Sequence, residues 1–529
     1  MLYPIIMKKI LLLVLGLSLA CNSSQKTVTP TEGISDKAVQ LEETAEDFAA
    51  TITENELQEH LFIYASDEYE GRETGEEGQK KAVEYIRTAY QELGIPAAKK
   101  DGDYLQSVPL EMEKLPTGTI TINDVIYYIG EEFVTIKSLV SQYDEIIYAG
   151  YGIEEDEYSD FRGLDVTDKI VLMKFGEPVN DDGTYVLSGN NEKSDWSNIS
   201  EAIGKRRLLA KSKGAKGILY YDQANYSRYT SSYNSMRRNK PGNMGIKSAT
   251  RNPVIFYLSK EMANAIYSGI EADTEPKSLK VNAVFELSTN NDEISTENVA
   301  AILRGSEKPN EYVIISSHLD HIGVTADGQI NNGADDDGSG TVAMLEMAEA
   351  FKKAADKGYG PKRSVVFLHV TGEEKGLLGS QYYTDIDPIF PLEHTVANLN
   401  IDMIGRIDPK RDGDRNYVYL IGSDKLSTDL HQLSEEINEK YSGLELDYKY
   451  NDENDPNRFY YRSDHYNFAK NNIPIIFYFN GTHEDYHRPG DTPDKINYDL
   501  LENRSRLIFH TAWAVANRDQ RVIVDKASK

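Results

Sequence analysis

Cysteine is almost absent from this sequence. The 529 residues include a single cysteine, Cys21, so no disulfide can form within the chain. A zinc site built on several cysteine thiolates is excluded for the same reason. Any metal ion must therefore be held by histidine, aspartate and glutamate, and the chain has ten histidines.

Long hydrophobic runs and positive charge are also scarce. The apolar run at residues 10–15 is too short to cross a membrane, which takes about 20 apolar residues. The formal net charge is -29, and so acidic a surface repels phosphates, so we expect no nucleic-acid partner. Hydrophobic residues make up 40% of the chain, which is enough for a folded core, and the length suggests two or three domains.

The N-terminus has the pattern of an export signal. A basic start and the short apolar run lead through small residues to Ala20-Cys21. This dipeptide resembles a bacterial lipoprotein cleavage site, after which the cysteine carries lipid; a plain secretory signal that happens to end in cysteine is the alternative. We expect a signal peptide over residues 1–21, a flexible tether over 22–50, and a mature protein held in the cell envelope only by the lipid on Cys21.

Apolar spacing predicts where helices and strands lie. Residues 54–95 have helical spacing interrupted by a turn-rich loop, and short apolar runs between 119 and 287 are typical of strands. From residue 298 strands and helices alternate, as in an α/β sheet flanked by helices. We expect one α/β domain formed by residues 51–118 and 291–529, with a mostly β domain inserted over 119–290.

Five clusters of polar residues lie mostly at or just past predicted strand ends, where ligands gather in α/β sheets. The first contains His318 and Asp320, two positions apart in an extended segment, so their side chains point the same way. A metal-bound histidine usually donates its second ring N–H to a carboxylate, and Asp320 fits that role. Taken alone, the pair is a weak signal, and a surface His–Asp contact is the more common explanation.

The second cluster is a run of carboxylates, Asp335, Asp336 and Asp337, flanked by glycines. A carboxylate in such a turn can bridge two cations. The spacing from Asp335 to Glu346 also fits, roughly, a calcium-binding EF-hand loop. That motif needs a helix on both sides, and turn signals precede Asp335, so we favour the bridging interpretation.

The third cluster begins at Thr371, directly after the predicted strand Val365–Val370, and contains Glu373 and Glu374. Adjacent side chains point in different directions, so one carboxylate can ligate a metal while the other takes a proton from water that the metal activates. Two solvated glutamates in a surface loop are the alternative.

The last two clusters complete a set of metal ligands. Asp402 is a carboxylate on an otherwise apolar strand, where an unpaired charge would be costly. Residues 482–492 follow the strand Ile475–Phe479 and contain histidines. Together the clusters supply ligands in the order His, Asp, Glu, Asp, His, which suits two zinc ions. We expect neither a helix with an HExxH motif nor a GxSxG elbow, so thermolysin-type and serine hydrolases lack support.

In order and spacing these clusters resemble the co-catalytic zinc peptidase family that includes bacterial leucyl aminopeptidases, glutamate carboxypeptidases and, more distantly, glutaminyl cyclases. The similar segments are SSHLDH, GADDDGSG, VTGEEKGLLGS, NIDMIG and DYHRPGDTPDKI. The resemblance implies an α/β sandwich with a mixed central sheet flanked by helices. It also implies two Zn²⁺ ions as cofactors and peptides or proteins as substrates.

The resemblance also implies roles for individual residues. Glu373 is the implied general base, and Asp320 is the residue that orients His318. Asp337 follows a cis peptide bond in the resembling enzymes, and His465 belongs to a motif near the pocket. The implied zinc ligands are His318 and Asp402 for one ion, Glu374 and His487 for the other, and Asp336 for both.

The middle block of the chain, residues 119–290, resembles a protease-associated domain. The similar segments are Tyr148–Ile153, Asp165–Pro178 and Ala210–Tyr221. In the family such a domain is inserted in the peptidase and limits access to it. Nothing in this block indicates catalysis.

The pattern favours an aminopeptidase, because a cluster of carboxylates suits the ammonium group of a peptide N-terminus. A carboxypeptidase or dipeptidase would need a cation for the terminal carboxylate, and Arg406 and Arg488 lie close in sequence to two ligands. A glutaminyl cyclase or an inactive binding homologue is disfavoured by the complete ligand set. His321 and His483 flank ligand clusters and are candidates for contact with substrate.

Overall fold

The computed structural model describes residues 44–526 except 156, 239–241 and 248–251. Cys21, the expected signal peptide and most of the expected tether lie outside the described residues. At its end, the segment expected to be tether forms a short helix, α1 (Ala45–Ala49), because Phe48 is buried and stacks on Trp513. Within the described ranges, each helix is too short or too polar to cross a bilayer.

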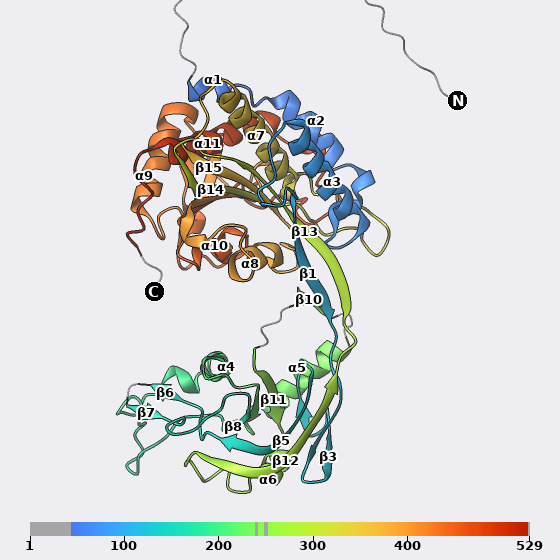
Figure 1. The fold of residues 1–529 in the computed structure, drawn as a ribbon, viewed down its shortest axis with the longest axis vertical. Helices are drawn as coiled ribbons and strands as arrows, with labels where there is room; N and C mark the ends of the chain where they lie inside the picture. Colours follow the sequence, from blue (N-terminus) through green and yellow to red (C-terminus); the bar gives the residue numbers. More distant parts are fainter. Residues whose placement is uncertain (1–43, 156, 239–241, 248–251, 527–529) are drawn as a thin grey trace, which may run out of the picture. The chain divides into compact units, whose positions relative to one another are not determined.

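A nine-stranded sheet carries the predicted site (Figure 1). Its central strands β15, β14, β16 and β19 are parallel neighbours, and antiparallel strands extend it on both sides. The expected mixed central sheet is therefore confirmed. In spatial order the strands are β10 (Asn243–Ile246), β1 (Leu105–Glu113), β13 (Asp292–Leu303), β15 (Arg363–Val370), β14 (Lys308–His318), β16 (Thr395–Ile401), β19 (Ile475–Phe479), β17 (Tyr417–Ile421) and β18 (Glu445–Asp447).

The central strands are apolar on both sides because helices cover both faces of the sheet. In β14, Val313 and Ile315 join the core on one face, and Ile314 joins the core on the other. A continuous apolar run, rather than an alternating one, is what a strand buried on both faces requires. The strand Ile475–Phe479 has the predicted bounds.

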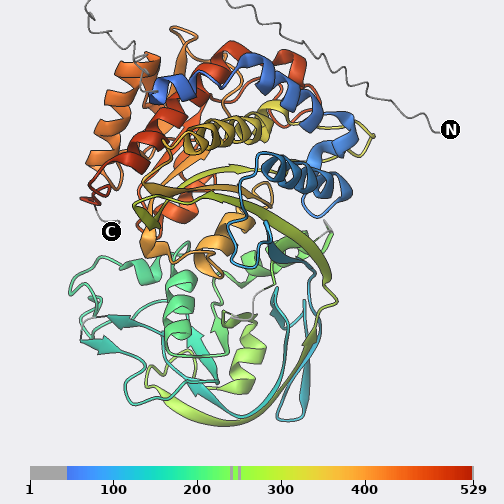
Figure 2. The ribbon, with the colours of Figure 1, turned by 45° about the horizontal axis from the view of Figure 1, so that its top comes forward.

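Two layers of helices enclose this sheet (Figures 1 and 2). On one face α7 and α11 pack together, with the rings of Phe351 and Phe509 4.7 Å apart. The other face is covered by α8 and α10. The helices of this domain are α1, α2 (Glu54–Tyr64), α3 (Glu77–Glu92), α7 (Gly340–Asp356), α8 (Leu378–Asp385), α9 (Thr428–Ile437), α10 (His465–Ala469) and α11 (Tyr498–Asn517).

The middle block forms an eight-stranded sheet of its own. It is less purely β than expected, because β5, β8, β9 and β11 run parallel and parallel strands need crossover connections. The helices of this block are α4 (Ala202–Ser212), α5 (Tyr226–Arg238) and α6 (Lys260–Ile266). Its strands, in spatial order, are β3 (Val125–Tyr128), β2 (Thr117–Ile122), β12 (Lys277–Ser288), β5 (Leu139–Tyr148), β8 (Ile170–Lys174), β9 (Gly217–Tyr221), β11 (Val254–Leu258) and β4 (Phe133–Val134), and a separate pair is β6 (Glu154–Glu155) and β7 (Tyr158–Ser159).

One strand of the middle block departs from the expected division. β10 lies within residues 119–290, yet it pairs with β1 as the edge of the nine-stranded sheet. The expected boundary near residue 290 coincides with the short break between β12 and β13.

Candidate metal centre and active site

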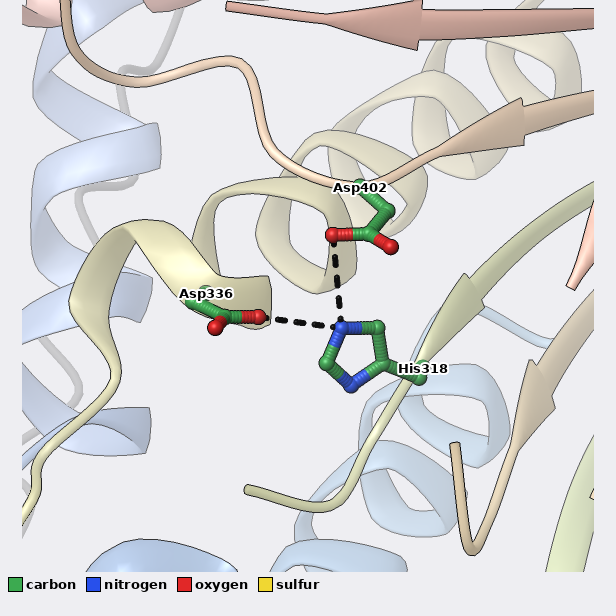
Figure 3. Close-up of side chains that lie close together, drawn as sticks. All are labelled: His318, Asp336 and Asp402. Atoms are coloured by element: carbon green, nitrogen blue, oxygen red, sulfur yellow. Dashed lines mark ion pairs between the residues drawn. The ribbon is translucent and has the colours of Figure 1, made fainter. Parts of the chain in front are cut away.

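The predicted ligands come together at the carboxyl ends of parallel strands. His318 is the last residue of β14, and Asp402 directly follows β16. Because these strands are neighbours in the sheet, their ends lie side by side. Asp336 reaches the same place from the segment Ala334–Ser339, which leads into α7. In Figure 3 the His318 ring points toward both carboxylates.

Asp336 lies between two groups of ligand atoms. Its Oδ1 is 3.2 Å from Nε2 of His318, and its Oδ2 is 3.1 Å from Nε2 of His487. Asp402 completes the first group, with Oδ1 3.5 Å from Nε2 of His318. Glu374 completes the second, with Oε2 3.2 Å from Nε2 of His487. One carboxylate thus offers a different oxygen to each group, as a bridging ligand does.

His321 joins the second group, where the sequence suggested only a substrate contact. Its Nδ1 lies 2.8 Å from Oε1 of Glu374 and 3.7 Å from Oδ2 of Asp336, and the side chain is fully buried. The sequence signal that could have revealed it is its position three residues after His318, just past the end of β14. His483, the other flanking histidine, instead meets Asp335, with 3.2 Å between Nε2 and Oδ2.

The atoms that face this centre fit a zinc site. Buried polar atoms without a hydrogen-bond partner are uncommon and cost about 1–3 kcal/mol each. Nitrogen and carboxylate oxygen atoms are ligands that zinc takes in proteins, so a bound cation would satisfy atoms that the protein leaves without partners. The buried atoms without a hydrogen-bond partner here include His318 Nε2, both ring nitrogens of His321, Asp336 Oδ2 and Glu374 Oε1.

The pKa values of the two adjacent glutamates are shifted in opposite directions. Burial raises the pKa of the Glu373 carboxyl well above its usual range. Burial and the negative charge of Asp336 also raise the pKa of the Glu374 carboxyl. The contacts with His321 and His487 outweigh both effects and lower that pKa to about 2. Glu374 is therefore the ionised carboxylate of the pair, the form that a metal ligand takes, and Glu373 is the carboxylate suited to accept a proton.

Asp320 supports both sides of the centre, though not by the expected contact. The ring Nδ1 of His318 lies 3.0 Å from the backbone carbonyl oxygen of Asp320, not from its carboxylate. The reason is that β14 ends at His318, so Asp320 no longer follows strand geometry. Its carboxylate accepts hydrogen bonds from the Glu373 backbone N–H at 3.1 Å and from the hydroxyl of Thr74 at 2.6 Å. Asp320 thus also holds the backbone of the implied base.

Asp337 and Asp491 fix the segment that carries Asp336. The Asp336–Asp337 peptide bond is cis, as the resemblance implied, and the Asp337 carboxylate accepts from the backbone N–H groups of His318 and Gly340. Asp491 accepts from the backbone N–H groups of Asp336 at 3.1 Å and Asp335 at 3.0 Å. No pattern in the sequence indicated this role for Asp491.

The letters at 483–487 spell HExxH, but the structure excludes a site of that type. These residues lie in a turn rather than a helix. His483 pairs with Asp335, whereas His487 faces Asp336 and Glu374, so the two rings serve different contacts. The EF-hand alternative is also wrong, because Glu346 lies inside α7 and groups with other glutamates, not with Asp335.

Three residues that the sequence placed near the site, Arg406, Arg488 and His465, are not positioned to contact substrate. Arg406 is held by carboxylates, with Nη2 3.2 Å from Asp485 and Nη1 4.0 Å from Asp491. Arg488 is exposed. The buried ring of His465 stacks on Phe477 and donates from Nε2 to a backbone carbonyl, so it supports the floor of the site.

A cleft with aromatic walls opens onto the ligands. Phe459 and Phe477 line it, and Arg462 lies across the face of Phe459. Tyr486 stacks on His487, with ring centroids 3.9 Å apart. The sequence did not single out these residues, because an apolar pattern shows that an aromatic side chain is buried but not that it faces a cleft. The lining residues are Asp336, Glu373, Asp402, Phe459, Arg462, Phe477, Phe479 and Tyr486.

A mixed α/β sheet whose strand ends gather imidazoles and carboxylates around unpartnered ligand atoms defines a metal-dependent hydrolase. Residues 298–512 match peptidase family M28, and this segment contains all the ligands described above. This part of the chain is therefore similar to that family of peptidases, as the sequence resemblance implied.

Three known proteins illustrate the similarity. The chain is 26% identical over 488 residues to the probable leucine aminopeptidase 2 of Aspergillus oryzae, covering 86% of this chain and 81% of that protein. It is 28% identical to aminopeptidase YwaD of Bacillus subtilis, over 51% of this chain and 48% of that one. The solved aminopeptidase from Aneurinibacillus sp. strain AM-1 aligns with 92% of this chain and 99% of its own, at 20% identity and a TM-score of 0.45.

Proposed function

We propose that this metallopeptidase is a two-zinc aminopeptidase that releases N-terminal residues from peptides. The observation that carries the proposal is the bridging position of Asp336, whose two oxygens face His318 and His487 separately. His318, Asp402 and Asp336 would hold one zinc ion; Glu374, His487 and Asp336 would hold the other. Bound there, the ions would lower the pKa of water and polarise the scissile carbonyl.

The protein side chains divide the remaining work. Glu373 would take a proton from the attacking water and pass it to the leaving amine, with its backbone fixed by Asp320. The aromatic walls of the cleft would bind the side chain of the first residue. The three carboxylates in the cleft, Asp336, Glu373 and Asp402, favour a substrate ammonium group over a carboxylate.

The surroundings of the arginines also favour a site that binds the N-terminus of a peptide substrate over one that binds its C-terminus. A carboxypeptidase needs a free guanidinium to bind the terminal carboxylate. Arg406 is already bound to Asp485, and Arg488 does not line the cleft. Arg462 is the cation among the cleft residues, and it gives the carboxypeptidase alternative a residue that can be tested.

Blocked peptides distinguish the two alternatives. The zinc-loaded enzyme should hydrolyse peptides with a free amine, lose this activity when the amine is acetylated, and be indifferent to amidation of the C-terminus. Activity that survives N-acetylation and disappears on C-terminal amidation would establish a carboxypeptidase instead. In that case Arg462→Gln should abolish the preference for a free C-terminus.

We also propose a location and an accessory domain. Ala20-Cys21 supports a lipid-anchored protein of the bacterial cell envelope. The segments within 119–290 support a protease-associated domain that limits which peptides reach the site.

A further inference from the structure

A second group of carboxylates lies away from the active site, between α2 and α7. Glu346 and Glu349 are three residues apart on α7 and therefore share a face of the helix. Glu56 faces them from α2. Each side chain offers one carboxylate oxygen, and the three oxygens lie within 4.8 Å of one another. None of these residues contributes to the peptidase site.

Glu346 is a buried carboxyl group with one oxygen that has no hydrogen-bond partner. The side chain is only 2% exposed, and its Oε2 makes no hydrogen bond. The other oxygen lies 3.4 Å from Nε2 of His60, but burial lowers the pKa of that imidazole, so it is neutral at neutral pH. A buried carboxylate without full compensation is costly, and two further carboxylates beside it add repulsion. Without a cation this carboxyl group therefore keeps its proton at neutral pH, since burial and the two neighbours raise its pKa to about 8, and a bound cation would displace that proton.

The other groups around this cluster do not supply the missing charge. Lys353 pairs with Glu349, at 3.0 Å between Nζ and Oε1. The hydroxyl of Tyr85 lies 2.6 Å from Nδ1 of His60, and Glu59 on α2 adds further negative charge. Among the described residues, Lys353 is a cation whose charge acts on Glu346, and it faces several carboxylates that a bound cation would balance.

We propose that Glu56, Glu346 and Glu349 bind one Ca²⁺ ion. Ca²⁺ takes about six to eight oxygen ligands, including carboxylates in one- or two-oxygen contact, and accepts water for the rest. Glu56 and Glu349 are partly exposed, so water can complete the coordination. Zinc prefers sites that include nitrogen or sulfur ligands, which this group does not offer among its three members.

The ion would join the N-terminal helix layer to the segment that carries the bridging aspartate. α7 begins directly after Ala334–Ser339, which contains Asp336. α2 touches the same segment, because a Cβ on Gly338 would lie 2.8 Å from Leu61 Cδ1. Fixing α2 against α7 would therefore stabilise the protein near the metal centre without taking part in the reaction.

Calcium binding tests the proposal directly. The full-length, zinc-loaded protein is dialysed exhaustively against zinc-containing, calcium-free buffer. It is then titrated with CaCl₂ by calorimetry, and thermal unfolding is measured in parallel. We expect one saturable Ca²⁺ site and a higher unfolding temperature with Ca²⁺ than without it. Glu346→Gln and Glu349→Gln should each weaken binding at least about tenfold and abolish the thermal shift.

Glu59→Gln is the matched control. It removes the same charge from α2 at an exposed position outside the three ligands, so Ca²⁺ binding should persist. The amide in Glu346→Gln keeps the side-chain volume, so the variant should fold and retain peptidase activity in calcium-free buffer. No Ca²⁺ binding by the wild type, or equal binding by wild type and Glu346→Gln, would overturn the proposal.

Discussion

Glu373 and Glu374 are adjacent in the chain and differ in their surroundings. Glu373 is held through its backbone by Asp320 and has a pKa raised by burial, whereas imidazoles keep Glu374 ionised. The sequence could predict that the two carboxylates point in different directions. Which of them meets histidine depends on residues more than 50 positions away, and spacing along the chain does not contain that information.

Replacing each glutamate by glutamine should separate the two roles. Glu373→Gln preserves size and leaves the ligands in place, so bound zinc should be unchanged while turnover falls by at least about 10²–10⁴-fold. Glu374→Gln should lower zinc content. Metal analysis and steady-state kinetics on the same preparations check this, and near wild-type turnover in Glu373→Gln would refute the assigned base.

Removing the bridging carboxylate should affect both metal positions. Asp336→Ala takes away the one side chain that faces both ligand groups, so both zinc ions should be lost. His318→Ala removes a ligand from one group and should mainly weaken one ion. Zinc content measured by mass spectrometry of metals should read about two per wild-type chain. A wild type that holds a single tightly bound ion would contradict the two-zinc assignment.

At the scale of elements, apolar runs predicted the strands that carry the site, and turn signals predicted the loops between them. β19 has the predicted bounds. The alternation of strands and helices predicted from residue 298 did not define where each helix ends: α9 covers Thr428–Ile437, and a wider turn follows it. Packing between elements, as in α2 against α7, leaves no signature in the sequence of either helix.

That packing makes stability depend on the ionisation of Glu346. Burial, with Glu56 and Glu349, raises the pKa of Glu346 from 4.5 to about 8. Because the folded protein holds this proton more tightly than the unfolded chain, calcium-free stability should fall as pH rises from 4.5 to about 8. The expected loss is at most about 1.4 kcal/mol per pH unit over that interval.

Glu346→Gln should remove this dependence. The difference in free energy of unfolding between the variant and the wild type, from urea titrations in calcium-free buffer, should grow in favour of the variant from about pH 5 to about pH 8. Other titrating groups are common to both proteins and cancel in the difference. A difference that stays constant over this range would show that Glu346 titrates normally.

At the scale of the whole molecule, the chain combines a peptidase domain, an inserted second sheet and a predicted export segment. The lipid anchor can be tested by substitution. Cys21→Ser removes the thiol that would carry lipid, so the protein should move from the membrane fraction to the soluble envelope fraction or the medium. Cell fractionation with an antibody against the peptidase domain measures this shift, and an equal distribution of both forms would rule out the anchor.

The sequence by itself determined the α/β class, the positions of the central strands and the five clusters from which the centre is built. It could do so because buried strands need apolar runs, and because functional polar residues stand out at the ends of such runs. The tertiary structure decided that His321 joins the second ligand group, that Asp491 holds the backbone of Asp336, and that aromatic rings wall the cleft. These facts depend on contacts between segments that come together only when the sheet forms. Hydrophobic periodicity in the sequence shows that a residue is buried, but it does not show which residues become its neighbours.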